Sequence, residues 1–140
     1  MGTSLERIPK AEAPSLNESE AVFSLKYLDL SSRPKFHINQ CTAEFLGAFL
    51  SSLREMSRLR VCDACEYDNT RSSHHIAWEQ TSEPNGFEGL LDEQLEPEHF
   101  WQFALDSKTP WRIHGFWIDS TFFVVWLDPN HSLYPINSGR

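Results

Sequence analysis

The sequence predicts an α+β fold: an antiparallel sheet of four to five strands with one main helix packed on one face. Residues 42–59 place their apolar side chains along one helical stripe. Residues 99–127 contain three consecutive segments with the alternation of strands. The length of 140 residues, 40% of them hydrophobic, fits one domain with its own core.

Residues 1–20 are polar, contain two prolines and show no periodicity. We expect them to form a flexible tail before a single α+β domain over residues 21–140. No apolar run is long enough for a transmembrane helix, and the N-terminus lacks the apolar core of a signal peptide. Three cysteines without an export signal favour reduced thiols. The sequence therefore predicts a cytoplasmic protein that does not bind membranes.

The first half of the predicted domain contains a hairpin and the main helix. Residues 21–30 and 35–40 alternate like strands around the turn at 31–34, so we expect them to pair. Thr42 can cap the helix that follows, because its hydroxyl can accept a bond from an unpaired backbone N–H. The predicted buried stripe comprises Phe45, Leu46, Phe49, Leu50, Leu53 and Met56.

The middle of the chain gives weaker signals. Residues 61–71 suggest a second short helix, His74 and His75 fall in a predicted loop, and residues 86–95 have room for one or two helical turns. Residues 99–106, HFWQFALD, alternate clearly and predict a strand.

Two strands joined at Asp119 and Ser120 are predicted over residues 111–127. A two-residue turn pairs Ile118 with Thr121 and Phe116 with Phe123. If the strand pairing continues without interruption, His114 pairs with Val125 and Arg112 with Leu127. The face predicted to pack on the helix comprises Trp111, Ile113, Trp117, Phe122, Val124 and Trp126, and the opposite face Arg112, His114, Phe116, Phe123, Val125 and Leu127.

Asp128-Pro129-Asn130-His131 has the residue order of a type I turn. Such a turn brings His131 and Tyr134 back over the end of the strands that carry Arg112 and His114. Ribonucleases that work without a metal need a base, a cation at the phosphate and an acid, and histidine and arginine supply these groups. These four residues are the predicted catalytic set. The alternative is that the strand-end histidine and arginine only bond to carbonyls and carboxylates.

Other motifs give less support to chemistry. Cys62 and Cys65 form a CxxC sequence, but the neighbouring His74 and His75 are adjacent and do not make a second pair of zinc ligands. Cys41 precedes the main helix with no histidine fixed beside it. We therefore predict no metal and no cofactor.

The charge distribution is uneven. The net charge is −8, which gives no general attraction to nucleic acid. Between Ser72 and Ser107 there is no lysine or arginine, and the acidic residues of this region gather at 79–98. A solvated acidic face is the default reading, and a surface that binds a partner is the alternative.

The order of predicted elements over residues 42–135 resembles that of the RelE/ParE toxin superfamily. A helix and a helical connection are followed by three strands with the sequences FWQFALDS, WRIHGFWID and TFFVVWLD. That family usually has a single strand before its helices, whereas this sequence predicts two. The resemblance implies a small bacterial toxin that cuts ribosome-bound mRNA and is neutralised by an antitoxin. It also implies that Arg112 contacts phosphate and that His131 or Tyr134 acts as the late acid or base.

Two functions are therefore expected. The first is a toxin-like, metal-free endoribonuclease, with Arg112 at the phosphate, His114 or His131 as base and acid, and Tyr134 orienting them. Its partners would be RNA on the ribosome and a cognate antitoxin. The second is a non-catalytic interaction protein (an antitoxin, an inhibitor or a component of a defence system) that uses the acidic surface at 79–98.

Overall fold

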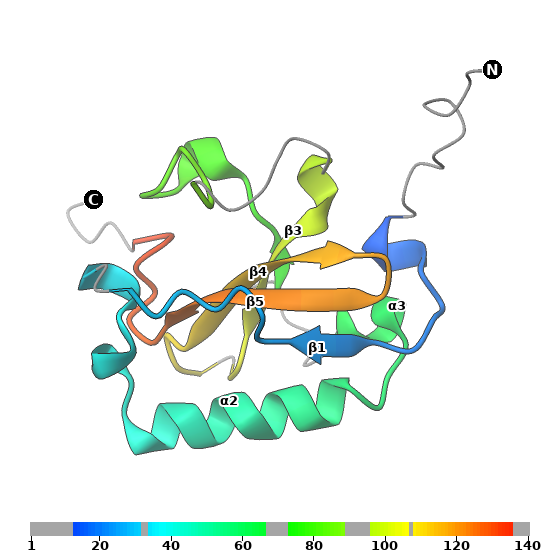
Figure 1. Ribbon diagram of the computed structural model, residues 1–140, viewed down its shortest axis with the longest axis horizontal. Coiled ribbons are helices and arrows are strands. Elements are labelled where there is room, and N and C mark those ends of the chain that lie inside the picture. The colour runs from blue at the N-terminus through cyan, green and yellow to red at the C-terminus, as the bar shows by residue number, and fades with distance from the viewer. Residues whose placement is uncertain (1–12, 32–33, 67–72, 89–95, 107, 136–140) are drawn as a thin grey trace.

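A computed structural model describes residues 13–31, 34–66, 73–88, 96–106 and 108–135 of the chain (Figure 1). A five-stranded sheet in the order β1-β5-β4-β3-β2 carries the main helix, α2, on one face. The α+β class is confirmed, with one difference: β1 is parallel to β5, whereas the other pairs are antiparallel. The strands are β1 Val22–Ser24, β2 His74–His75, β3 Phe100–Ala104, β4 Arg112–Ile118 and β5 Thr121–Asp128.

Residues before the predicted domain start belong to the fold. Part of the segment expected to be a tail packs on the fold: η1 (Pro14–Leu16) is a 3₁₀ turn with Pro14 buried. The side chain of Asn17 donates to the carbonyl of Asp119 over 3.3 Å, and the carbonyl of Ser19 accepts from Val61 N over 2.8 Å. These long-range bonds fix residues that are polar in sequence. Residues 1–12, the rest of the expected tail, lie outside the described part.

The predicted hairpin over residues 21–40 is wrong. Only β1 forms, and it pairs with β5 at the far end of the chain, Val22 opposite Thr121. Residues 34–40 fold into two 3₁₀ turns, η2 (Pro34–Phe36) and η3 (Ile38–Gln40). The ring of Phe36 stacks on Trp126 at 4.4 Å between centroids, so its apolar character serves packing on the sheet and not strand pairing.

The main helix is α2 (Ala43–Met56), and Thr42 caps it as predicted, its hydroxyl accepting from Phe45 N over 3.0 Å. Phe45, Phe49 and Met56 are buried against the sheet, but Leu50 is 61% exposed and does not belong to the buried stripe. The expected second helix forms as α3 (Val61–Ala64), and residues 67–71 of that prediction lie outside the described part. No described helix is both long and apolar enough to cross a membrane.

Three further elements complete the middle of the chain. His74 and His75 pair with β3 and are a short edge strand, so the predicted loop is wrong there. Two 3₁₀ turns, η5 (Trp78–Gln80) and η6 (Pro97–His99), flank a connection of which residues 89–95 lie outside the described part, including most of the expected helical turns. The strand predicted over 99–106 is confirmed as β3.

The β4–β5 hairpin begins in the predicted register and then shifts. Asp119 adopts a φ of 53° in the turn, and Ile118 pairs with Thr121 and Phe116 with Phe123. A bulge between His114 and Gly115 then inserts one extra residue of β5. The predicted partners of the last residues are therefore wrong, and the observed pairs are His114 with Trp126 and Arg112 with Asp128.

The bulge also exchanges two core side chains between faces. Leu127 packs on the α2 side of the sheet with Ile113, and Trp126 packs on the opposite side with Phe36. Gly115 lies at the bulge because a Cβ there would overlap the carbonyl oxygen of Phe123 and lie 2.8 Å from the ring of Phe122. The sheet thus buries one apolar cluster under α2 and a second, aromatic one on its other face.

Candidate functional site

Polar side chains form a row across the aromatic face of the sheet. His74 of β2 lies opposite Gln102 of β3, and Gln102 lies opposite His114 of β4. Nε2 of Gln102 is 3.3 Å from Nε2 of His74, while Gln102 and His114 are fully buried. Asp128 ends the row at the last residue of β5.

Asp128 connects this row to the turn that follows it. Its Oδ2 lies 2.8 Å from Nε2 of His114, and neither side chain is exposed. The same carboxylate accepts backbone bonds from Ser132 N at 2.7 Å and Leu133 N at 3.0 Å. The turn from 128 to 133 is therefore held in place by one buried carboxylate.

The pKa values of the pair favour a neutral imidazole beside a charged carboxylate. Burial lowers the pKa of His114 and outweighs the opposite effect of its hydrogen bond to Asp128. Burial acts to raise the pKa of Asp128, but the bonds from His114, Ser132 and Leu133 outweigh it, and that pKa is lowered. His114 then donates Nε2–H, and its other ring nitrogen is buried. His114 is a support and cannot reach a substrate.

Arg112 also lies inside the fold. Its Nη1 donates to the carbonyls of Thr109 at 2.8 Å, Trp111 at 2.9 Å and Asp106 at 3.4 Å, and the residue is 5% exposed. Burial lowers the pKa of its guanidinium. This arginine holds the connection between β3 and β4, and it does not face solvent as the predicted contact to phosphate requires.

Tyr134 has a structural partner as well. Its hydroxyl accepts a bond from Ala77 N over 2.8 Å, and its ring meets that of His74 edge-on at 5.3 Å. Burial raises the pKa of the phenol. The side chain joins the C-terminal turn to the residues after β2. Its hydroxyl is therefore used to hold that turn and not, as predicted, to orient the catalytic groups.

His131, like Tyr134, is partly exposed. Its backbone has a positive φ of 59°, an uncommon conformation for a residue with a side chain. Nδ1 lies 2.6 Å from the carbonyl oxygen of Tyr134. Because a carbonyl only accepts, Nδ1 carries the proton of the neutral ring, and Nε2 is the nitrogen that can take another.

A hollow of about 510 Å³ lies beside this imidazole, lined by His131, Asn130, Ser132, Ser82 and Lys35, with Pro110 and Pro135 at its sides. Nζ of Lys35 lies 2.8 Å from Oε2 of Glu83 and 3.4 Å from the carbonyl of Ser82. No sequence pattern connects Lys35 with His131, because the two residues lie far apart along the chain. The structure thus brings His131 together with Lys35, and leaves Arg112 and His114 inside the fold.

Two of the cysteines are shielded by the fold, Cys65 fully and Cys41 in part. Burial raises the pKa of Cys65 to about 12 and also raises that of Cys41, so neither thiol is activated. Within the described ranges, no three His, Cys, Asp or Glu side chains are grouped so that they could hold a metal ion. Searches against models of protein families, curated proteins and solved structures returned no match to this chain.

Proposed function

We propose that this protein is a cytoplasmic, toxin-like endoribonuclease that works without a metal, with its reaction centre at the hollow of His131 and Lys35. The observation that carries the proposal is the state of His131. Its Nδ1–H is committed to the carbonyl of Tyr134, and this leaves Nε2 as a base beside an open hollow. Imidazole is the side chain most often used as a general acid or base in catalysis.

The hollow offers groups for a phosphodiester. Lys35 supplies a positive charge for the phosphate. Its side chain is 40% exposed, so its ammonium can move from Glu83 to a bound phosphate. In the reaction, the ribose 2′-oxygen attacks phosphorus while its proton passes to Nε2 of His131. The bond from phosphorus to the 5′-oxygen breaks and leaves a 2′,3′-cyclic phosphate. The leaving oxygen takes a proton from water, and the resulting hydroxide is neutralised by protonated His131.

Arg112, His114 and Tyr134 keep supporting roles in this proposal. His114 and Asp128 fix the turn that carries His131, because the carboxylate holds the backbone N–H groups of Ser132 and Leu133 directly after it. A reacting group must be held to within a fraction of an ångström of its productive position. The buried pair thus serves the reaction through the position of His131.

The order of elements also supports the proposal. In the described part of the chain one strand, β1, precedes the helices, where the sequence predicts two, and a single strand there is what the resemblance to the RelE/ParE superfamily implies. The partners proposed on this basis are ribosome-bound mRNA and a neutralising antitoxin.

Expression in a bacterial host tests this function. Wild-type protein is expected to arrest growth and to yield RNA ends with cyclic phosphates. Purified protein is expected to yield the same ends when a chelator is present. His131→Ala and Lys35→Ala are expected to abolish cleavage. The matched control is His75→Ala, which removes an exposed imidazole of the edge strand β2.

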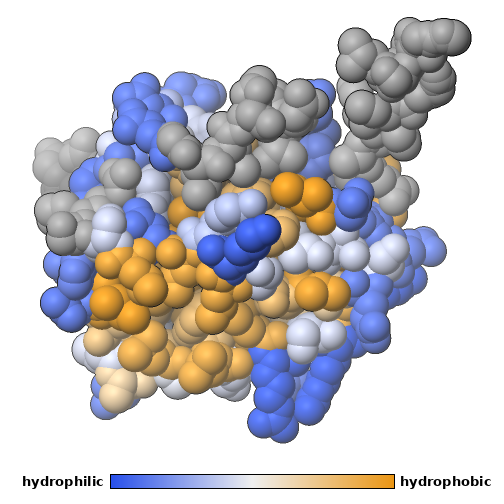
Figure 2. All heavy atoms as spheres, viewed as in Figure 1, coloured by the Kyte–Doolittle hydropathy of each residue, from blue (hydrophilic) through white to orange (hydrophobic). Residues whose placement is uncertain are grey.

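A non-catalytic interaction protein is the second candidate, and an exposed apolar surface favours it. Figure 2 shows this surface over the N-terminal half of α2 and the segment that crosses above it. Leu50 of α2 and Leu25 and Leu30 of the segment after β1 are exposed, and exposed apolar patches mark contact surfaces. If high-level expression is harmless and no RNA is cleaved on ribosomes, the endoribonuclease proposal is wrong and the interaction protein is the favoured function.

A further inference from the structure

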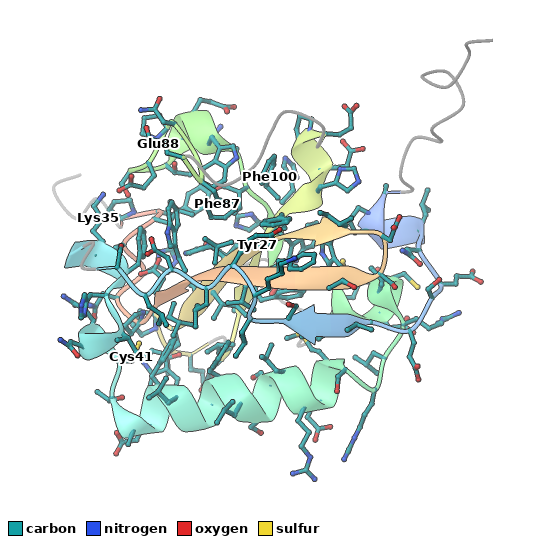
Figure 3. All side chains as sticks on the ribbon, viewed as in Figure 1. Tyr27, Lys35, Cys41, Phe87, Glu88 and Phe100 are labelled. Atoms are coloured by element: carbon teal, nitrogen blue, oxygen red, sulfur yellow. The ribbon has the colours of Figure 1, made fainter. Side chains whose placement is uncertain are left out.

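The cation of the His131 hollow, Lys35, is held by a carboxylate of the same chain. Nζ of Lys35 lies 2.8 Å from Oε2 of Glu83 and 3.4 Å from the carbonyl oxygen of Ser82. Figure 3 shows Lys35 on η2, from which it reaches toward the segment after η5. An ammonium group has three N–H donors, so these two contacts leave one for a ligand in the hollow. The charge that attracts a phosphate is already balanced by Glu83.

Glu83 is kept in this position by the backbone that carries it. Its N–H donates to Oγ1 of Thr81 over 3.1 Å. The hydroxyl of Ser82, directly before it, donates to the carbonyl of Ser132 over 2.8 Å. The segment that carries the carboxylate is therefore fastened to the same turn that carries His131.

This carboxylate opposes the binding of an anion in two ways. A phosphate at Lys35 lies close to Glu83, and the two negative charges repel each other. The phosphate also competes for the ammonium with a carboxylate that is tethered at the site and so has a high effective concentration. Among the described residues that line the hollow, Lys35 is the only lysine or arginine. This one ion pair therefore sets how strongly the lining attracts an anion.

We propose that Glu83 is a specificity-determining residue that competes with the phosphate of the substrate for Lys35. A small phosphate ester meets little besides this cation, and the carboxylate keeps its affinity low. An RNA strand also contacts the hollow with its riboses and bases, and this additional binding energy displaces the carboxylate. The inference rests on the proposed function, because it takes the ligand of Lys35 to be an RNA phosphodiester.

Binding is measured apart from cleavage with thymidylyl-thymidine, which has one phosphodiester and no 2′-hydroxyl to attack it. Isotope-labelled full-length protein is titrated, and the side-chain resonances of Lys35 and His131 are followed. Glu83→Gln is expected to bind this dinucleotide about two- to fivefold more tightly than the wild type does. Glu55→Gln is the matched control and is expected to bind like the wild type. It frees Arg58 from an exposed pair on α2 and changes the net charge equally.

A double-mutant cycle shows whether Glu83 acts through Lys35. In the Lys35→Met background, Glu83→Gln is expected to change the affinity by less than about twofold, because the cation for which it competes is gone. A gain that only reflects a loosened loop does not depend on Lys35. In the wild type, dimethyl phosphate is expected to bind more weakly than the dinucleotide, since it has the same charge without the nucleosides.

The outcomes separate this inference from the proposed function. Equal affinity of the wild type and Glu83→Gln, or the same gain without Lys35, would overturn the role of Glu83 even if RNA is cleaved. Equal affinity of the wild type for dimethyl phosphate and the dinucleotide would overturn the selectivity. Tighter binding by Glu83→Gln, when no protein cleaves RNA, would keep the role of Glu83 and overturn only the ribonuclease. No shift at Lys35 in any protein would overturn both.

Discussion

Nε2 of His114 and Oδ2 of Asp128 lie 2.8 Å apart, and no part of either side chain reaches solvent. They belong to neighbouring strands, and the pair closes the sheet end at which the C-terminal turn begins. Since the same carboxylate also accepts two backbone N–H bonds, it matters for stability and for the placement of His131 at once.

Asp128→Asn is expected to lower the free energy of unfolding by about 3 kcal/mol, because it removes the charge from a buried, hydrogen-bonded pair. The amide also directs two donors toward groups that themselves donate. Denaturant unfolding measures the change, with Glu55→Gln, an exposed carboxylate of α2, as the control. A loss no larger than that of the control would mean that the carboxylate does not hold the turn.

Acidification is expected to destabilise the protein through His114. Its pKa in the folded state is lowered, so the unfolded chain binds a proton that the folded chain does not. The contribution of neutral His114 to the free energy of unfolding is complete above 6.5, the pKa of histidine in the unfolded chain. It is lost as the pH falls below that pKa, with a slope of up to about 1.4 kcal/mol per pH unit. Unfolding of the wild type and of His114→Gln between about pH 7.5 and pH 5 measures it. Parallel pH dependences in the two proteins would exclude His114 as the source.

Gly115→Ala is expected to cost about 1–3 kcal/mol, since the added methyl group meets the backbone of β5 and the ring of Phe122. Gly47→Ala is the control, because a Cβ at that position of α2 has no heavy atom within 4 Å. The two thermal unfolding midpoints should therefore move in opposite directions, as alanine favours a helix over glycine. Full stability of Gly115→Ala would show that the bulge can relax.

Two substitutions of His131 separate the backbone from the side chain. Both His131→Ala and His131→Gly remove the imidazole and its bond to Tyr134. Glycine adopts the φ of 59° without the steric cost that alanine carries, so His131→Gly is expected to be the more stable by about 1 kcal/mol. Calorimetry compares them, and neither should cleave RNA. Cleavage retained by either variant would remove His131 from the reaction.

The elements with strong periodicity and the hairpin register next to the turn could be predicted from the sequence, and the register beyond the bulge could not. The stripe of α2 and the alternation of β4 and β5 are local properties, and both elements form as expected. The bulge at Gly115 depends on the approach of β5, and a glycine inside a strand was its only local signal. The sequence also alternates around Phe36, which predicted a strand there. The ring of Phe36 instead packs on Trp126, 90 positions further along the chain.

The predicted catalytic set divides for a similar reason. Residues two apart on a strand share a face, so Arg112 and His114 could be placed side by side. How deeply they lie depends on what covers that face, which includes Phe36 from far earlier in the chain. Lys35 joins His131 through the same crossing segment, and nothing in the sequence near either residue indicates it.

The parallel pair of β1 and β5 has a consequence during synthesis. β1 is made early, yet it pairs with a strand far later in the chain, Val22 opposite Thr121. The apolar side of α2 must therefore wait, without a sheet to cover it, for most of the chain to be translated. Contacts that span so much of the sequence slow folding and leave an unfinished chain prone to aggregation. The nascent protein should depend on chaperones far more than its small size suggests.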